Sequence, residues 1–161
     1  MSAFPLSHES TPRRLDHTDQ QIIDRLQHDG RMPFSVIADD IGIGEEAVES
    51  RVEDLRSTGV IDIVAVTDPL QLGYPRNAML GIEVDGEAKP VAESLQRIEE
   101  VVYLAITEGG FDLMAEVVGT SDAHLLELVT RIRPMPGVRR IHTFLYQELV
   151  KETYVYGTAK T

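Results

Sequence analysis

The sequence of 161 residues contains no cysteine and no tryptophan. Without cysteine the chain has no disulfide, no thiolate nucleophile and no thiolate metal ligand, which suits a reducing compartment. No apolar run approaches the roughly 20 residues that a membrane-spanning helix needs. The N-terminus also lacks the apolar segment of a signal peptide. We therefore expect a cytoplasmic protein with no membrane partner.

Basic residues are scarce, with 15 lysines and arginines against 27 acidic residues and a net charge of −12. Residues 1–62 hold only six arginines against thirteen acidic residues. Proteins that bind nucleic acid usually present a basic surface, because phosphate contacts supply much of the affinity. The charge alone therefore does not indicate a nucleic-acid partner.

Signatures of catalysis are also missing. The five histidines stand at no metal-ligand spacing, and we find neither a G-x-S-x-G motif nor a cysteine nucleophile. Gly42 to Ala47 fits the dinucleotide pattern G-x-G-x-x-A, but the residues before it have helical rather than strand spacing. Asp112 with His142 is a weak candidate for an acid–base pair. We expect no enzyme, no cofactor and no metal site.

The most informative stretch is Ser35 to Gly59, which predicts two short helices joined by a tight turn. Each helix has one apolar face, formed by Ile37, Ala38 and Ile41 in the first and by Val48, Val52 and Leu55 in the second. Gly42 and Gly59 stand where these helices must end, since glycine adopts the left-handed conformation without a Cβ clash. Helix, glycine-containing turn and helix is typical of a DNA-reading helix-turn-helix.

A further helix precedes this motif. Thr18 and Gln21 have the spacing of a capping box, Ile22, Ile23 and Leu26 follow on one face, and Asp29-Gly30 ends the helix. Three helices in this order predict a compact domain over residues 15–62, after a flexible arm over residues 1–14. The predicted core consists of Leu15, Ile22, Ile23, Leu26, Ile37, Ile41, Val48, Val52 and Leu55.

Residues 63–76 predict a linker made of a strand and a turn, the strand being the β-branched run from Val60 to Val66. Residues 77–156 then alternate strands with helices in the order βαββαβ, a ferredoxin-like arrangement, and residues 157–161 form a tail. We expect a last long strand over 138–150 and another short strand over 153–156. Both faces of the long strand carry large apolar groups, which predicts a homodimer through the sheet; alternatively, the C-terminal segment covers that face.

The chain resembles the Lrp/AsnC (leucine-responsive/asparagine regulator, or feast/famine) family. The matching residues are Leu15–Arg31, the helix-turn-helix, Arg51–Ile61, G-G-F-D at 109–112, M-P-G-V at 135–138 and the strand ending at Glu152. The resemblance implies an α+β protein with an N-terminal winged helix-turn-helix and a ferredoxin-like effector-binding and oligomerisation domain of the RAM type. It implies double-stranded DNA and a small effector, an amino acid, as partners, and dimers that associate into higher even oligomers.

Carried over by position, the resemblance places the effector at Gly109, Gly110, Phe111 and Asp112, with Ser121 and Tyr146 as further lining residues. Two glycines allow backbone N–H groups to approach a carboxylate, and Asp112 suits an ammonium group. The same Gly-Gly pair equally suits a plain hairpin turn. The Arg131, Arg133, Arg139 and Arg140 group offers an anion site or a solvated edge that offsets nearby carboxylates.

The candidate DNA contacts are Glu45, Glu46, Glu49, Ser50, Arg51 and Arg56. Two features depart from the family: Gly44 replaces a Ser or Thr cap, and the outward positions are acidic. Glutamate accepts a hydrogen bond from cytosine N4 but repels phosphate. Arg51 and Arg56 have carboxylates nearby on the helix with which they can pair. We predict a sequence-specific, effector-responsive transcription regulator. The alternative is the same architecture with weakened DNA binding, acting as an effector-binding or heteromeric partner.

Overall fold

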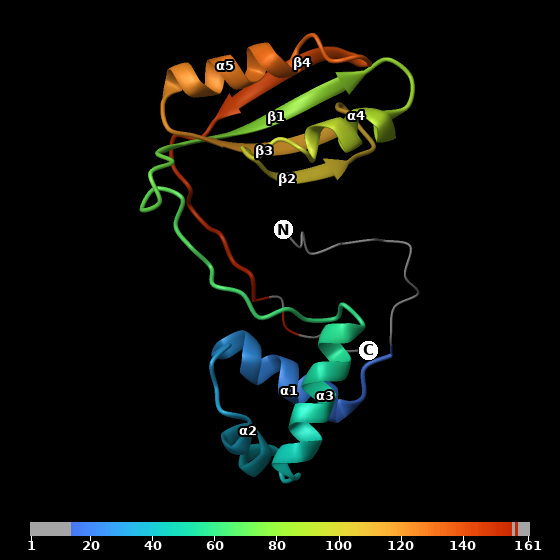
Figure 1. The fold of residues 1–161 in the computed structure, drawn as a ribbon, viewed down its shortest axis with the longest axis vertical. Coiled ribbons are helices and arrows are strands. Elements are labelled where there is room, and N and C mark those ends of the chain that lie inside the picture. The colour runs from blue at the N-terminus through green and yellow to red at the C-terminus, as the bar shows by residue number, and fades with distance from the viewer. Residues whose placement is uncertain (1–13, 156, 158–161) are drawn as a thin grey trace. The chain divides into compact units, whose positions relative to one another are not determined.

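The computed structural model describes residues 14–155 and residue 157 (Figure 1). Most of the predicted arm, together with Tyr156 and residues 158–161, lies outside the described residues. The chain divides into two compact units, one formed by residues 1–65 with 151–161 and the other by residues 66–150. No helix in the described part of the chain is long and apolar enough to cross a bilayer.

The first unit contains three helices, α1 (His17–His28), α2 (Phe34–Ile41) and α3 (Glu45–Ser57). Gly42 ends α2 in the left-handed conformation, with φ of 75°, and Gly44 precedes α3 without a side-chain cap. This confirms the predicted helix-turn-helix. Its core contains the expected residues apart from Leu15, with Ile22, Ile37 and Val48 fully buried and Leu26 and Ile41 partly buried against them. Leu15 is only partly buried and lies outside this cluster.

The predicted cap of α1 is wrong by two residues. Asp16, not Thr18, is the N-cap, and Asp19 rather than Gln21 completes the capping box. A carboxylate is as good an N-cap acceptor as a hydroxyl. Starting the helix at His17 also places Asp19, which is 2% exposed, beside the third helix.

The second unit is a four-stranded sheet with two helices. Its strands are β1 (Arg76–Val84), β2 (Val101–Ile106), β3 (Leu113–Gly119) and β4 (Val138–Leu145). Helix α4 (Ala88–Leu95) follows β1, and α5 (Asp122–Ile132) follows β3. The spatial order is β2-β3-β1-β4 and all neighbours are antiparallel, which confirms the predicted ferredoxin-like topology (Figure 1).

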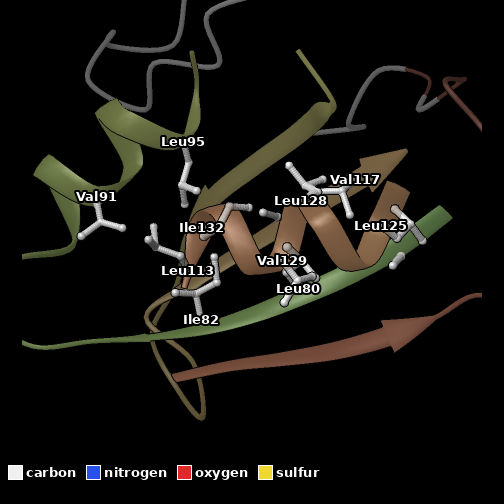
Figure 2. Packing of buried hydrophobic residues seen from close by; sticks show 12 residues of the cluster. Leu80, Ile82, Val91, Leu95, Leu113, Val117, Leu125, Leu128, Val129 and Ile132 are labelled. Atoms are coloured by element: carbon white, nitrogen blue, oxygen red, sulfur yellow. The ribbon is translucent and has the colours of Figure 1, made fainter. Parts of the chain in front are cut away.

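Both helices pack on one face of this sheet. Ala78, Leu80 and Ile82 of β1 are fully buried there against α4 and α5, and Figure 2 shows the cluster that they form with the helices. Because successive side chains alternate along a strand, Met79, Gly81 and Glu83 belong to the opposite face. The register continues this face into β4, where Phe144 is opposite Met79 and His142 is opposite Gly81.

Three predicted strand segments are absent from the described residues. Residues 60–66 are not in a strand, nor are 146–150 or 153–155. A strand exists only through hydrogen bonds to a neighbour, and β4 loses its neighbour where β1 begins. The last contact on this side is the Tyr146 N–H, which donates to the carbonyl oxygen of Asn77 at 3.0 Å.

Two leucines of α5 test which face of the helix carries the stability. Leu128 is 1% exposed and Leu126 is 66% exposed. We expect Leu128→Ala to lower the free energy of unfolding by about 2–5 kcal/mol, since it loses buried area and leaves a cavity. Leu126→Ala should change it by less than about 0.5 kcal/mol. Urea denaturation followed by circular dichroism measures both, and equal effects would contradict the packing described.

Candidate DNA-binding helix and effector loop

Helix α3 turns one polar side to solvent. Val48, Val52 and Leu55 are buried, so the residues between them are directed away from the core. The structure exposes Glu45, Glu46, Glu49 and Ser50 on the N-terminal half of the helix. Glu45 and Glu46 occupy the first turn, where negative charge is favoured by the helix dipole. Four of the six candidate DNA contacts therefore share an accessible surface.

The other two candidates, Arg51 and Arg56, are already paired with carboxylates. Arg51 Nη1 donates to Asp16 Oδ2 and Asp19 Oδ1, both at 2.7 Å. Arg56 lies 3.7 Å from Glu53 on the same helix, in an exposed pair. A third arginine of the first unit, Arg25, pairs with Asp40 at 3.2 Å. Internal pairing thus engages basic groups of this unit and leaves the outer side of α3 acidic.

The predicted effector loop joins β2 to β3 and is held by hydrogen bonds to β1. Asp112 N–H donates to the carbonyl oxygen of Ile82 at 3.0 Å, and Asp112 Oδ2 accepts from Val84 N–H at 2.7 Å. The Thr107 hydroxyl donates to the carbonyl oxygen of Phe111 at 2.7 Å. Gly109 has φ of 141°, a conformation open to glycine, and Gly110 has open space around it. The two glycines are accessible while Asp112 is anchored.

Phe111 links this loop to the face of the sheet opposite the helices. Its ring lies directly over Gly81, where an added Cβ would come within 2.7 Å of the ring. The ring is tilted against His142, with centroids 5.1 Å apart, and edge-on to Phe144 at 5.9 Å. Gly81 is therefore required for space and not for its backbone angles. The sequence carried no signal for this, because a glycine inside a strand has several explanations.

Ser121 and Tyr146 lie at the other end of the sheet. Ser121 caps α5 by accepting from His124 N–H at 3.1 Å, and it follows the end of β3, whereas Asp112 precedes its start. Seven strand residues separate the two, about 20 Å at the usual rise per residue. Within one chain, the structure brings Gly109, Gly110, Phe111 and Asp112 together but does not add these two residues. Their contact with an effector stays a prediction.

Two charged clusters were not predicted in detail. Glu83 accepts from His142 Nε2 at 3.0 Å and also pairs with Arg139, so His142 partners Glu83 and not Asp112. Glu100 lies between Arg131, at 2.9 Å, and His124, at 3.3 Å. Burial acts to raise the pKa of Glu100, but its backbone N–H, Arg131 and His124 outweigh this and lower the pKa below 4.5. Arg131 and Arg139 thus offset nearby carboxylates, which was the second of the two interpretations of this arginine group.

Beside the Glu100 cluster is a half-open hollow of about 370 Å³. It is bounded by the segment that precedes β1 and by the start of β2, with Leu72, Tyr74, Val102 and Val118 among its lining residues. The sequence contained no pattern for it, because the lining residues come from segments far apart in the chain. It lies at the end of β3 opposite the effector loop.

An exposed helix-turn-helix followed by a separate ferredoxin-like domain defines a DNA-binding regulator of two domains. Family models divide the chain in the same way: the AsnC-type helix-turn-helix domain matches residues 15–56, and the Lrp/AsnC ligand binding domain matches residues 77–156. The chain belongs to the Lrp/AsnC family of transcriptional regulators. It is a DNA-binding regulator that responds to a small effector, and it is not an enzyme.

Named relatives agree with this assignment. The HTH-type transcriptional regulator FL11 of Pyrococcus horikoshii is 33% identical over 141 residues, covering 86% of this chain and 93% of the relative. The crystal structure of the Mycobacterium tuberculosis leucine response regulatory protein LrpA has a TM-score of 0.82 and 26% identity, covering 89% of this chain and all of that one. Nothing in these relatives favours the alternative of a regulator with weakened DNA binding.

The fold also matches that of a Neisseria meningitidis transcriptional regulator solved as a complex with L-methionine. The TM-score is 0.78 at 18% identity, and the match covers 88% of this chain and 95% of that one. At this identity the likeness is one of fold.

The hydrogen bonds of Asp16 predict that the stability of the protein depends on pH. Hydrogen bonds from the Asp19 N–H and from Arg51 lower the pKa of Asp16 below its ordinary 3.8. The unfolded chain therefore takes up this proton at a higher pH than the folded chain. The stabilisation is complete above about pH 4–5 and is lost as the pH falls through the lowered pKa.

We expect Asp16→Asn, which keeps a capping oxygen, to lose less stability between pH 5 and pH 3 than the unmodified protein. Urea denaturation across this range measures the difference. Identical pH profiles for the two proteins would show that the Asp16 charge does not stabilise the fold.

Proposed function

We propose that this regulator reads a specific DNA sequence with α3 and senses an amino acid at the loop of residues 109–112. The observation that carries the DNA-reading role is the orientation of α3, whose apolar stripe is wholly buried while Glu46, Glu49 and Ser50 face solvent. A helix presented in this way fits the major groove. Since its target is the chromosome, we place the protein in the cytoplasm.

The acidic side of α3 restricts how this helix binds DNA. Glutamate accepts a hydrogen bond from cytosine N4, and serine bonds to several bases, so the exposed groups suit base recognition. They do not suit phosphate, and the affinity of one reading unit is expected to be low. Two such units on one assembly bind more tightly, because the second binding event becomes intramolecular. The proposed dimer described below supplies that second unit.

Glu46→Gln tests whether α3 faces DNA. Removing one carboxylate from the contact surface should tighten binding to a random-sequence duplex about 1.4- to five-fold, from the roughly 0.2–1 kcal/mol typical of an exposed charge pair. Fluorescence anisotropy at low salt measures the affinity. Glu127→Gln, an equal change on the exposed side of α5, should leave it unaltered. Equal affinities for all three proteins would exclude α3 from the interface.

The effector site is proposed on the loop between β2 and β3. Gly109 and Gly110 leave backbone N–H groups accessible to a ligand carboxylate, and the anchored carboxylate of Asp112 stands nearby for an ammonium group. An α-amino acid presents these two charges together. The ligand binding domain of the family covers this loop, and the N. meningitidis protein of the same fold was solved with L-methionine.

A thermal-shift screen of the twenty amino acids tests this site. A ligand at 100 times its Kd should stabilise the protein by about 2.7 kcal/mol. Asp112→Asn keeps an acceptor for Val84 N–H but removes the charge, so it should abolish the shift. Glu127→Gln should retain it. A shift that survives in Asp112→Asn would place the ligand elsewhere.

We also propose a homodimer through the face of the sheet opposite α4 and α5, with higher even oligomers built from it. Phe144 on this face is 49% exposed, and Tyr103 of β2 is 48% exposed. Half-exposed aromatic groups on one surface are typical of a protein interface. The alternative cover, the C-terminal segment, belongs to the other compact unit from Lys151 onward.

Phe144→Glu tests this interface, because a carboxylate there would be desolvated without a partner. We expect the unmodified protein to sediment as a dimer or a larger even oligomer at micromolar concentration, and Phe144→Glu to shift toward the monomer. Leu126→Glu, on the exposed side of α5, is the matched control and should keep the wild-type state. A monomeric wild-type protein would refute the interface.

A further inference from the structure

Arg51 is the one candidate DNA contact that is only partly exposed, and it borders the buried stripe of α3. It is three residues after Val48 and four before Leu55, so it lies beside these core residues on the helix surface. From its contacts we propose that Arg51 is a positioning residue, which holds the recognition helix on the N-terminus of α1 rather than binding DNA itself. The proposal rests on α3 being the helix that reads DNA.

The capping box of α1 creates the binding site for this guanidinium. Asp16 Oδ1 accepts from Asp19 N–H at 2.7 Å, and Asp19 Oδ2 accepts from Asp16 N–H at 3.3 Å. In each carboxylate one oxygen accepts within the cap, and the other, Asp16 Oδ2 or Asp19 Oδ1, accepts from Arg51 Nη1.

Electrostatics favour this contact. The cap brings two negative charges close together, and the Asp19 side chain is only 3% exposed. A buried carboxylate without a cationic partner is strongly unfavourable. The Arg51 side chain, at 37% exposure, supplies the positive charge to both. If Arg51 turned toward a phosphate, Asp19 would lose this ion pair.

The same contact controls base recognition because it joins α3 to α1. Hydrogen bonds to base edges depend on the exact placement of the helix in the groove. Without the link, α3 keeps its apolar contacts but loses the ion pair between Arg51 and Asp19 of α1, so its orientation is less defined. The expected loss is therefore in discrimination between sequences rather than in general affinity for DNA.

Asp19→Asn separates positioning from simple electrostatics. The substitution removes a negative charge from the DNA-binding unit, so electrostatics alone predicts tighter binding to any duplex. We predict instead that binding to the duplex most enriched from a random library by the unmodified protein weakens at least about tenfold, the loss of one good base contact. Binding to a scrambled duplex should stay equal or tighten. Asp39→Asn, an equal charge change on the exposed side of α2, should not weaken binding to either duplex.

The ratio of the affinities for the two duplexes distinguishes a loss of base recognition from a folding defect. A smaller folded fraction weakens binding to both duplexes by the same factor and leaves their ratio unchanged. Arg51→Gln should lower the ratio at least as far as Asp19→Asn does, and the double variant should lower it no further than Arg51→Gln, because the contact with Asp19 is then already lost. The dependence of log K on log salt should keep its slope in Arg51→Gln, whereas loss of a phosphate contact reduces the slope by about one.

A wild-type ratio in Asp19→Asn, or a slope reduced by about one in Arg51→Gln, would overturn the positioning role while leaving DNA recognition by α3 intact. A wild-type protein that enriches no duplex would overturn sequence-specific recognition and the positioning role together. The two failures are thus distinguishable.

Discussion

The contact of Arg51 with Asp16 and Asp19 is the interaction on which the DNA-binding unit depends. One guanidinium binds both carboxylates of the α1 cap, of which that of Asp19 is almost fully buried, and joins the first helix of the unit to the third. The buried stripe of Val48, Val52 and Leu55 packs α3 on the core. In the role that we propose for Arg51, two hydrogen bonds of 2.7 Å from a single nitrogen add to this packing.

This contact is one of several that pair the arginines of the first unit with its own carboxylates. Arg25, Arg51 and Arg56 each pair with carboxylates of the same unit, so these basic groups stabilise the fold rather than create a basic surface. The outward side of α3 is left with glutamates and a serine, which suit base edges better than phosphates. The dimer that we propose through the second domain would bring two such reading units together.

The second domain uses the two faces of one sheet differently. The face with Leu80 and Ile82 is sealed by α4 and α5 and supplies the core. The opposite face carries Phe144, His142 and the ring of Phe111, which reaches it from the loop between β2 and β3. The proposed effector loop and the proposed dimer surface therefore share a side chain. Gly81 makes room for that ring.

The sequence by itself determined the order of the elements and the buried side of each helix, because helical and strand periodicities are local and glycines mark the ends. It determined the helix-turn-helix and the βαββαβ order in this way. Only the tertiary structure decided which carboxylates Arg51 joins, that Phe111 lies on Gly81, and that Ser121 and Tyr146 lie far from the loop in one chain. It also ended β4 at Leu145, which is opposite Ala78 and so within two residues of the start of β1 at Arg76. Each of these depends on which distant residues become neighbours, and a strand or an ion pair exists only when its partner is in place.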